Sequence, residues 1–169
     1  HDVPGFHTLP NFMNSIVDDD VYMRWTQFGV FSSHIRSHGT NKREPWHYPA
    51  IAPMIKKWWK LRYTLIPYIV EQSRKAIASG APLLQALIFH HPEDKLCWHI
   101  DDEYYFGNDF LVAPVMNSEN RRDVFLPEMG EFLHRRTLGR GTLAEESGYP
   151  LGRNARICTS RSDHPRLSG

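Results

Sequence analysis

The chain has 169 residues, of which 41% are hydrophobic and 23% are charged. These values are typical of globular proteins and exclude a wholly disordered or collagen-like chain. The net charge of +1 gives no reason to expect nucleic acid or an anionic membrane as a partner, and no apolar run is long enough to span a bilayer. With two cysteines and no CxxC pattern, the sequence predicts no disulfide framework and favours a cytoplasmic protein.

The first 132 residues alternate between helix and strand patterns. Three aspartates open an apolar pattern of helical spacing, which predicts a helix over about 18–29. The β-rich segment 30–35 is predicted to be a short strand. Apolar residues at i, i+3 and i+4 spacing then predict a long helix over about 53–78, with a kink expected at Pro67.

Three further apolar segments follow the long helix. The continuous run 82–89 predicts a strand that is buried on both faces. Residues 104–115 read as a short turn followed by a strand, and residues 122–127 as a last strand. Helices that alternate with buried strands indicate an α/β fold with a parallel sheet.

The composition changes after Phe132. Residues 133–169 contain seven Arg, no Lys and a single aromatic residue, Tyr149. Their apolar residues follow neither a helical nor a strand period, so this tail is predicted to be disordered. A change of reading frame or of splicing near Glu131 is another explanation for the switch in composition.

The candidate site residues lie in the loops where α/β folds place their sites, at the carboxyl ends of strands. The first of these loops holds Asp2 and Phe6, and the second holds Arg36 and His38. A carboxylate, a guanidinium, an imidazole and an aromatic ring together suit a neutral polyhydroxylated ligand. A structural ion pair between Asp2 and Arg36, and a loop role for His38, remain the alternatives.

The sequence predicts no metal site and no cofactor site. His90, His91 and His99 are close in sequence, but adjacent residues of a strand point to opposite faces of the sheet. None of the common nucleotide-binding, zinc-hydrolase or serine-hydrolase motifs is present.

An ordered series of motifs resembles glycoside hydrolase family 31, in particular its α-xylosidase and α-glucosidase members. The similarity covers residues 1–132 and is expected to stop after Phe132. The segments that carry it are His1–Phe6, Val21–His38, Lys42–Trp46, Leu61–Tyr68, Tyr104–Gly107, Leu111–Val115 and Phe125–Pro127.

The resemblance implies the domain organisation. Residues 1–116 would form about the last three strand–helix units of a (β/α)₈ barrel, and residues 117–132 the start of a C-terminal β-sandwich. Residues 133–169 would be a divergent tail. Asp2 would end the sixth barrel strand, His38 would follow the seventh, and residues 83–89 would form the eighth.

The resemblance also implies the activity. The chain would be a fragment of a retaining α-glycosidase that hydrolyses the O-glycosyl bonds of an α-xyloside or α-glucoside, small molecule or oligosaccharide, without a cofactor. Asp2, Phe6, Arg36 and His38 would bind substrate. The nucleophile and the acid/base belong to family motifs upstream of His1, so the isolated chain is expected to be inactive. The alternatives are a non-catalytic carbohydrate-binding or interaction module, or a pseudogene product.

Overall fold

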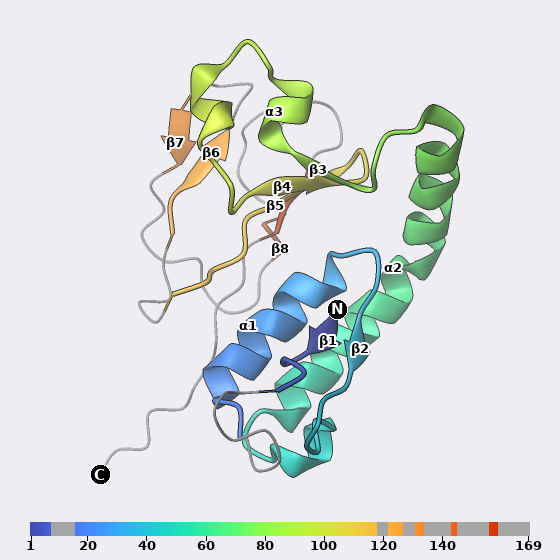
Figure 1. Cartoon of the computed structure of the whole chain (residues 1–169), viewed down its shortest axis with the longest axis vertical. Helices are drawn as coiled ribbons and strands as arrows, with labels where there is room; N and C mark the ends of the chain where they lie inside the picture. The colour runs from blue at the N-terminus through green and yellow to red at the C-terminus, as the bar shows by residue number, and fades with distance from the viewer. Residues whose placement is uncertain (8–15, 118–121, 127–130, 134–142, 145–155, 159–169) are drawn as a thin grey trace. The chain divides into compact units, whose positions relative to one another are not determined.

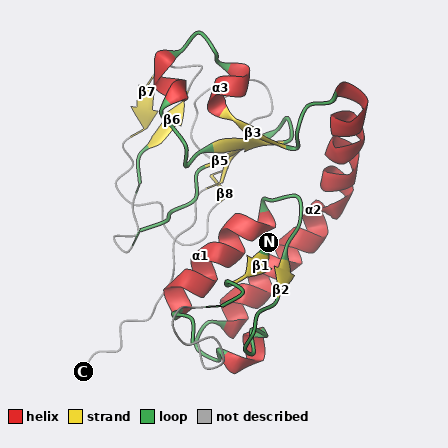
Figure 2. Cartoon of the chain, viewed as in Figure 1, coloured by secondary structure: helices red, strands yellow, loops and turns green. Residues whose placement is uncertain are grey.

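The computed structural model describes residues 1–7, 16–117, 122–126, 131–133, 143–144 and 156–158. The chain divides into two compact units. The first comprises residues 1–85 and 106–108, and the second comprises residues 86–105 and 109–169. Figure 1 follows the chain through its elements, and Figure 2 distinguishes helices, strands and loops. The two long helices belong to the first unit.

The first unit consists of a two-stranded parallel sheet and two long helices. Strand β1 pairs with β2, and Asp2 lies opposite Arg36 in the ladder. In Figure 1 the two strands lie beside each other next to helices α1 and α2. The elements are β1 (Asp2–Val3), α1 (Asp19–Val30), β2 (Arg36–Ser37), the 3₁₀ turn η1 (Pro45–His47) and α2 (Ala52–Ser79).

Helix α1 confirms the predicted helix and moves its end to Val30. The Asp18 side chain caps it by accepting a hydrogen bond of 2.9 Å from the backbone N–H of Asp20. The predicted strand 30–35 is wrong. Val30 ends the helix, and the Ser32 hydroxyl then donates to the Gly29 carbonyl at 2.8 Å, which holds the chain in a turn. These side-chain bonds compete with a strand ladder for the same backbone groups.

Helix α2 confirms the predicted long helix and continues through Pro67. It ends at Gly80, whose φ of 75° is the left-handed conformation that glycine adopts most easily. The Gly80 N–H donates to the Ala76 carbonyl at 2.8 Å and closes the last turn. The kink at Pro67 stays a prediction.

The core of the first unit lies between strand β1 and the helices. Val3 is fully buried and packs with Tyr22 and Met23 of α1. Ile51 and Ile55, at the start of α2, close the same cluster and are also fully buried. The side chain next to Asp2 in the chain therefore anchors β1, so that the position of Asp2 is fixed from inside the unit.

The remaining elements are short. A five-stranded sheet has the order β3-β4-β5-β9-β8, and β6 and β7 form a separate antiparallel pair. These elements are β3 (Leu84–Ala86), α3 (Leu87–His90), the 3₁₀ turn η2 (Lys95–Trp98), β4 (Tyr104–Phe106), β5 (Phe110–Val112), β6 (Val124–Leu126), β7 (Glu131–Leu133), β8 (Leu143–Ala144) and β9 (Arg156–Cys158).

Two of the apolar segments differ from their predicted form. The run 82–89 is a strand only over β3, and its last residues turn into α3. The segment 104–115 holds two strands, β4 and β5, with Gly107 between them at a φ of 59°. The predicted strand 122–127 is confirmed as β6. An apolar run alone does not separate a buried strand from a buried helical turn.

Among the described residues, strands β1 and β2 pair with each other, and β3 belongs to the five-stranded sheet. The partial barrel stays a prediction. The Gly107 N–H donates to the Leu83 carbonyl at 2.9 Å, next to the start of β3. The predicted disordered tail contains the short strands β8 and β9, and its other residues beyond Leu133 lie outside the described part of the chain.

Asp102, Glu103 and Arg122 form a cluster of charged side chains in the second unit. Arg122 donates to the Asp102 carboxylate at 2.9 Å and to the Glu103 carboxylate at 3.3 Å. The same Glu103 oxygen accepts from the backbone N–H of Phe125 at 3.1 Å, while its other oxygen is buried and has no hydrogen-bond partner among the described residues. Burial raises the pKa of Glu103 to about 7, against the opposing effects of the Phe125 N–H and Arg122.

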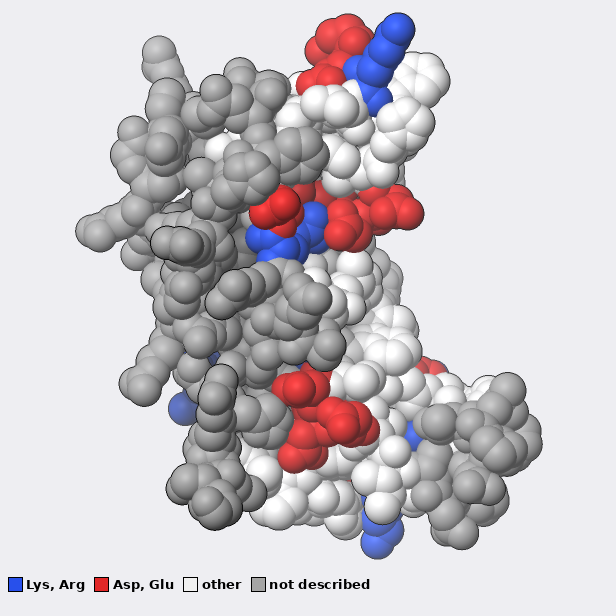
Figure 3. All heavy atoms as spheres, turned by 90° about the vertical axis from the view of Figure 1, so that its left-hand side faces the viewer, with Lys and Arg blue, Asp and Glu red and all other residues white. Residues whose placement is uncertain are grey.

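Charged side chains of both signs are distributed over the surface. Figure 3 shows acidic and basic groups lying among uncharged residues on one face of the molecule. This distribution accords with a chain that carries 20 basic and 19 acidic residues.

Candidate functional site

The four predicted site residues lie on β1 and β2 or directly after them: Asp2 and Arg36 are the first residues of the two strands, and Phe6 and His38 lie in the loops that follow. The parallel ladder places Asp2 directly opposite Arg36. The Asp2 carboxylate accepts two hydrogen bonds from the Arg36 guanidinium, one from Nε and one of 3.3 Å from Nη2. Two hydrogen bonds between planar groups fix the orientation of both side chains and hold the two opposite charges together.

The ion pair also determines the protonation state of the Asp2 carboxyl group. The hydrogen bond from Arg36 holds the pKa of Asp2 below its ordinary value of 3.8, and the charges of Arg36 and His38 act in the same direction. Asp2 is therefore a carboxylate at neutral pH, which accepts hydrogen bonds and does not donate them. The Arg36 side chain is two-thirds exposed, so the pair faces solvent.

The loops that follow the two strands bring Phe6 and His38 together. Their ring centroids are 5.3 Å apart, with the ring planes tilted by 58°. The backbone holds the contact, because the His38 N–H donates to the Val3 carbonyl at 3.2 Å and the Thr40 N–H donates to the Phe6 carbonyl at 2.7 Å. A hydrogen-bonding imidazole thus lies against an apolar ring at the end of the strands.

The structure adds Arg43 to this site, whereas the sequence reasoning singled it out only as part of the family-like segment Lys42–Trp46. Arg43 is 2% exposed and is the largest of the fully buried side chains in the described residues. Its Nε donates to the Gly5 carbonyl at 3.2 Å, in the loop that leads to Phe6. The nearest sequence signal is Gly39, because a glycine beside a candidate histidine indicates a close approach of another group.

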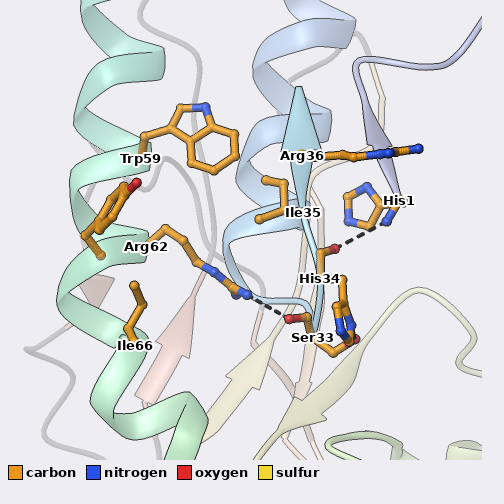
Figure 4. A pocket seen from close by; sticks show the side chains of 9 residues that line it. His1, Ser33, His34, Ile35, Arg36, Trp59, Arg62 and Ile66 are labelled. Atoms are coloured by element: carbon orange, nitrogen blue, oxygen red, sulfur yellow. Dashed lines mark hydrogen bonds between the residues drawn. The ribbon is translucent and has the colours of Figure 1, made fainter. Parts of the chain in front are cut away.

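Two hollows open on the first unit at opposite ends of the strands. The larger, of 570 Å³, lies between α2 and the segment that precedes β2, as Figure 4 shows. Trp59, Arg62 and Ile66 line it from α2, and Arg36 reaches its edge. The smaller, of 460 Å³, lies at the carboxyl end of β1 and is lined by Phe6. The other residues around the smaller hollow are Pro4, Gly5, His7, Ile16, Val17, Asp18, Val21 and Trp25.

Arg62 forms one wall of the larger hollow and braces the end of α1. It donates to the Val30 carbonyl at 2.8 Å and to the Ser33 carbonyl at 2.8 Å, the second of which is drawn in Figure 4. A cation at the carboxyl end of a helix stabilises it. Burial lowers the pKa of Arg62 from its ordinary value, without removing its charge at neutral pH.

Two of the three histidines considered as metal ligands, His90 and His91, have other contacts. The His91 Nε2 lies 2.9 Å from the Tyr105 hydroxyl, and the His90 ring meets the Tyr105 ring edge-on at a centroid distance of 4.8 Å. Within the described ranges, no group of three His, Cys, Asp or Glu side chains is arranged to hold a metal ion. The same residues include no helix with the length and hydropathy of a membrane span.

Two sequence models of one family match most of the chain. The glycosyl hydrolases family 31 TIM-barrel domain matches residues 1–72, and the glycosyl hydrolase family 31 C-terminal domain matches residues 80–151. The second match extends beyond Phe132, so the expectation that similarity stops there is wrong. The two matches meet between residues 72 and 80, earlier than the predicted end of the barrel at residue 116.

Relatives and solved structures agree with this family. The chain is 33% identical to an α-xylosidase of Emericella nidulans over 77% of its residues, and 35% identical to neutral α-glucosidase AB of Sus scrofa over the same share. It spans only 16% and 14% of their lengths. A family 31 α-xylosidase from a soil metagenome, solved with xylose, superposes with a TM-score of 0.66 at 29% identity, over 78% of this chain and 24% of that one. The chain belongs to glycoside hydrolase family 31.

Proposed function

We propose that this chain is the C-terminal part of the (β/α)₈ catalytic barrel of a retaining α-glycosidase, continuing into the domain that follows. The substrate would be an α-xyloside or α-glucoside. One observation carries the proposal: Asp2 pairs with Arg36 on two neighbouring parallel strands, and Phe6 lies against His38 in the loops at the carboxyl ends of the same strands. Barrel enzymes build their sites at these strand ends.

The chemistry of each side chain fits one part of a sugar ring. The Asp2 carboxylate accepts hydrogen bonds from hydroxyl groups, and the His38 imidazole can donate or accept one. The Phe6 ring covers the C–H surface of the sugar. Arg36 keeps Asp2 ionised and oriented. The proposed site would therefore hold the sugar ring while the chemistry takes place beside it.

Retaining hydrolysis needs two carboxyl groups about 5 Å apart, one as nucleophile and one as acid/base. Asp2 suits neither role. A nucleophile needs a carboxylate that is open to the sugar, whereas both Asp2 oxygens accept hydrogen bonds from Arg36. An acid must carry a proton, whereas the pKa of Asp2 is lowered. The family resemblance assigns both catalytic carboxyl groups to segments outside these 169 residues.

The test is the kinetics of a His38→Ala variant in a complete enzyme that carries this chain. The substitution removes hydrogen bonds to the sugar that strengthen as the ring distorts toward the transition state, so kcat/KM should fall by about a hundredfold. The assay is nitrophenol release from aryl α-xylosides and α-glucosides.

His34→Ala is the matched control for this experiment. His34 is an exposed histidine of the same unit that precedes β2, and the known contact of its ring is with the neighbouring Ser33 hydroxyl at 3.0 Å. The control should keep kcat/KM within about twofold of the unmodified enzyme, which is under 0.5 kcal/mol of barrier. A loss of equal size in both variants, or none in His38→Ala, would contradict the site assignment.

A further inference from the structure

We propose that Arg43 is a positioning residue that holds Phe6 against His38 in the sugar site, an inference that rests on the proposed function. Arg43 acts on the backbone of the two loops that carry the Phe6 and His38 rings. Its burial, at 2% exposure, places the whole guanidinium between these loops and the core.

The first contact is with the loop after β1. The Arg43 Nε donates to the Gly5 carbonyl at 3.2 Å. Gly5 has a φ of 115°, a conformation that residues with a side chain rarely adopt, and it directly precedes Phe6. A hydrogen bond to this peptide therefore fixes the direction in which the chain enters Phe6.

The second contact is with the loop after β2. Gly39 directly follows His38, and a Cβ atom at Gly39 would lie 2.7 Å from the Arg43 Nε and 2.8 Å from the Phe6 carbonyl oxygen. The Arg43 side chain thus occupies the space that a side chain at Gly39 would need. One side chain touches the residue before Phe6 and the residue after His38.

The backbone of Arg43 is itself held in place. The Tyr22 hydroxyl of α1 and the Ser37 hydroxyl of β2 both donate to the Arg43 carbonyl, the second at 2.7 Å. Arg43 Nη1 also lies 3.5 Å from the Tyr48 hydroxyl. The backbone of Arg43 therefore has a fixed position in the first unit. Its guanidinium holds the loops after β1 and β2 relative to that position.

Arginine is suited to this role for a chemical reason. Its planar guanidinium offers five N–H donors in a rigid fork, whereas a lysine ammonium offers one flexible charge and an apolar residue offers no donor. Burying such a group costs free energy unless its N–H groups find acceptors. If this position only had to fill space in the core, an apolar residue would do so without that cost. We infer that the donors, and not only the volume of Arg43, are what the site uses.

The experiment compares Arg43→Met and Arg43→Lys with Arg62→Met in a complete enzyme. Arg62 is the matched control, because it also donates to backbone carbonyls of the first unit but lies beside the hollow before β2. Kinetics are measured well below the melting temperature of each variant, so that loss of stability does not enter. Displacement of the rings should lower kcat/KM by about tenfold to a hundredfold in Arg43→Met. Arg62→Met should stay within about twofold.

A second measurement does not depend on activity. In isotope-labelled protein, nuclear Overhauser contacts between the ring protons of Phe6 and His38 report their separation, which is 5.3 Å between centroids. The contacts should be lost in Arg43→Met, weakened in Arg43→Lys and kept in Arg62→Met. An inactive unmodified enzyme would refute the proposed function alone, since the ring contacts still test Arg43. Unchanged contacts in the Arg43 variants, or equal kinetic losses in the Arg43 and Arg62 variants, would overturn the positioning role.

Discussion

Replacing Glu103 by Gln should remove a pH dependence from the stability of this protein. The Glu103 side chain is completely buried, and its pKa in the folded chain is about 7 against an ordinary value of 4.5. Because the folded pKa is the higher one, the stability that the protonated carboxyl contributes is fully present below about pH 4.5. It is lost as the pH rises through about 7, when the buried group must become charged.

The size of the effect follows from the shift. One pKa unit corresponds to 1.36 kcal/mol, so the free energy of unfolding should lose about 3 kcal/mol through Glu103 between pH 4.5 and pH 8. Gln keeps the shape and an acceptor for the Phe125 N–H, while Arg122 keeps Asp102 as its partner. Relative to the unmodified protein, Glu103→Gln should therefore gain about 3 kcal/mol over the same pH range.

The measurement is urea unfolding of both proteins from pH 4.5 to pH 8. All other titrating groups are shared and cancel in the difference between the two proteins. Asp102→Asn is the control, because it also takes a carboxylate from Arg122 but at a half-exposed position, and it should keep the original pH dependence. A difference between Glu103→Gln and the unmodified protein that stays constant with pH would show that the pKa of Glu103 is not raised in the folded protein, and would refute the reasoning.

Two substitutions in the first unit test its packing. Arg62→Ala removes charge-assisted bonds to the Val30 and Ser33 carbonyls, and should lower the free energy of unfolding by about 2–3 kcal/mol, measured by urea denaturation. Gly107→Ala places a Cβ atom 2.7 Å from the Gln72 Cγ at a φ of 59°, and should cost about 1–3 kcal/mol, seen as a lower melting temperature. Arg62→Ala with unchanged stability, or Gly107→Ala with an unchanged melting temperature, would contradict the corresponding contact.

The sequence predicted those features that depend on local patterns. The bounds of α1 and α2 followed from acidic residues at a helix start, from helical apolar spacing and from Gly80 at a helix end. Asp2 and Arg36 were expected in loops at the carboxyl ends of neighbouring strands, whereas they are opposite each other as the first residues of β1 and β2. No long-range contact had to be known for either prediction.

The errors and omissions depend on contacts between distant parts of the chain. Segment 30–35 has strand-forming residues, but Arg62, about thirty positions later, binds the carbonyls that a strand ladder would have used. The buried Glu103 owes its position to Arg122 and Phe125, and nothing adjacent to it in sequence indicates burial. Arg43 looks like a solvated loop residue until the fold brings Gly5 to its Nε.

The two-residue ladder between β1 and β2 has a consequence for changes in chain length. Side chains alternate between the two faces of a strand, so a slip of one position exchanges those faces. Such a slip would bring Val3, now fully buried, beside Arg36 and would turn the Asp2 carboxylate toward the apolar cluster. The observed register therefore keeps the Asp2–Arg36 ion pair at the surface and Val3 in the core at the same time. A one-residue insertion or deletion within either strand would therefore disturb the ion pair and the core packing at once, whereas a single exchange of side chains disturbs one of them.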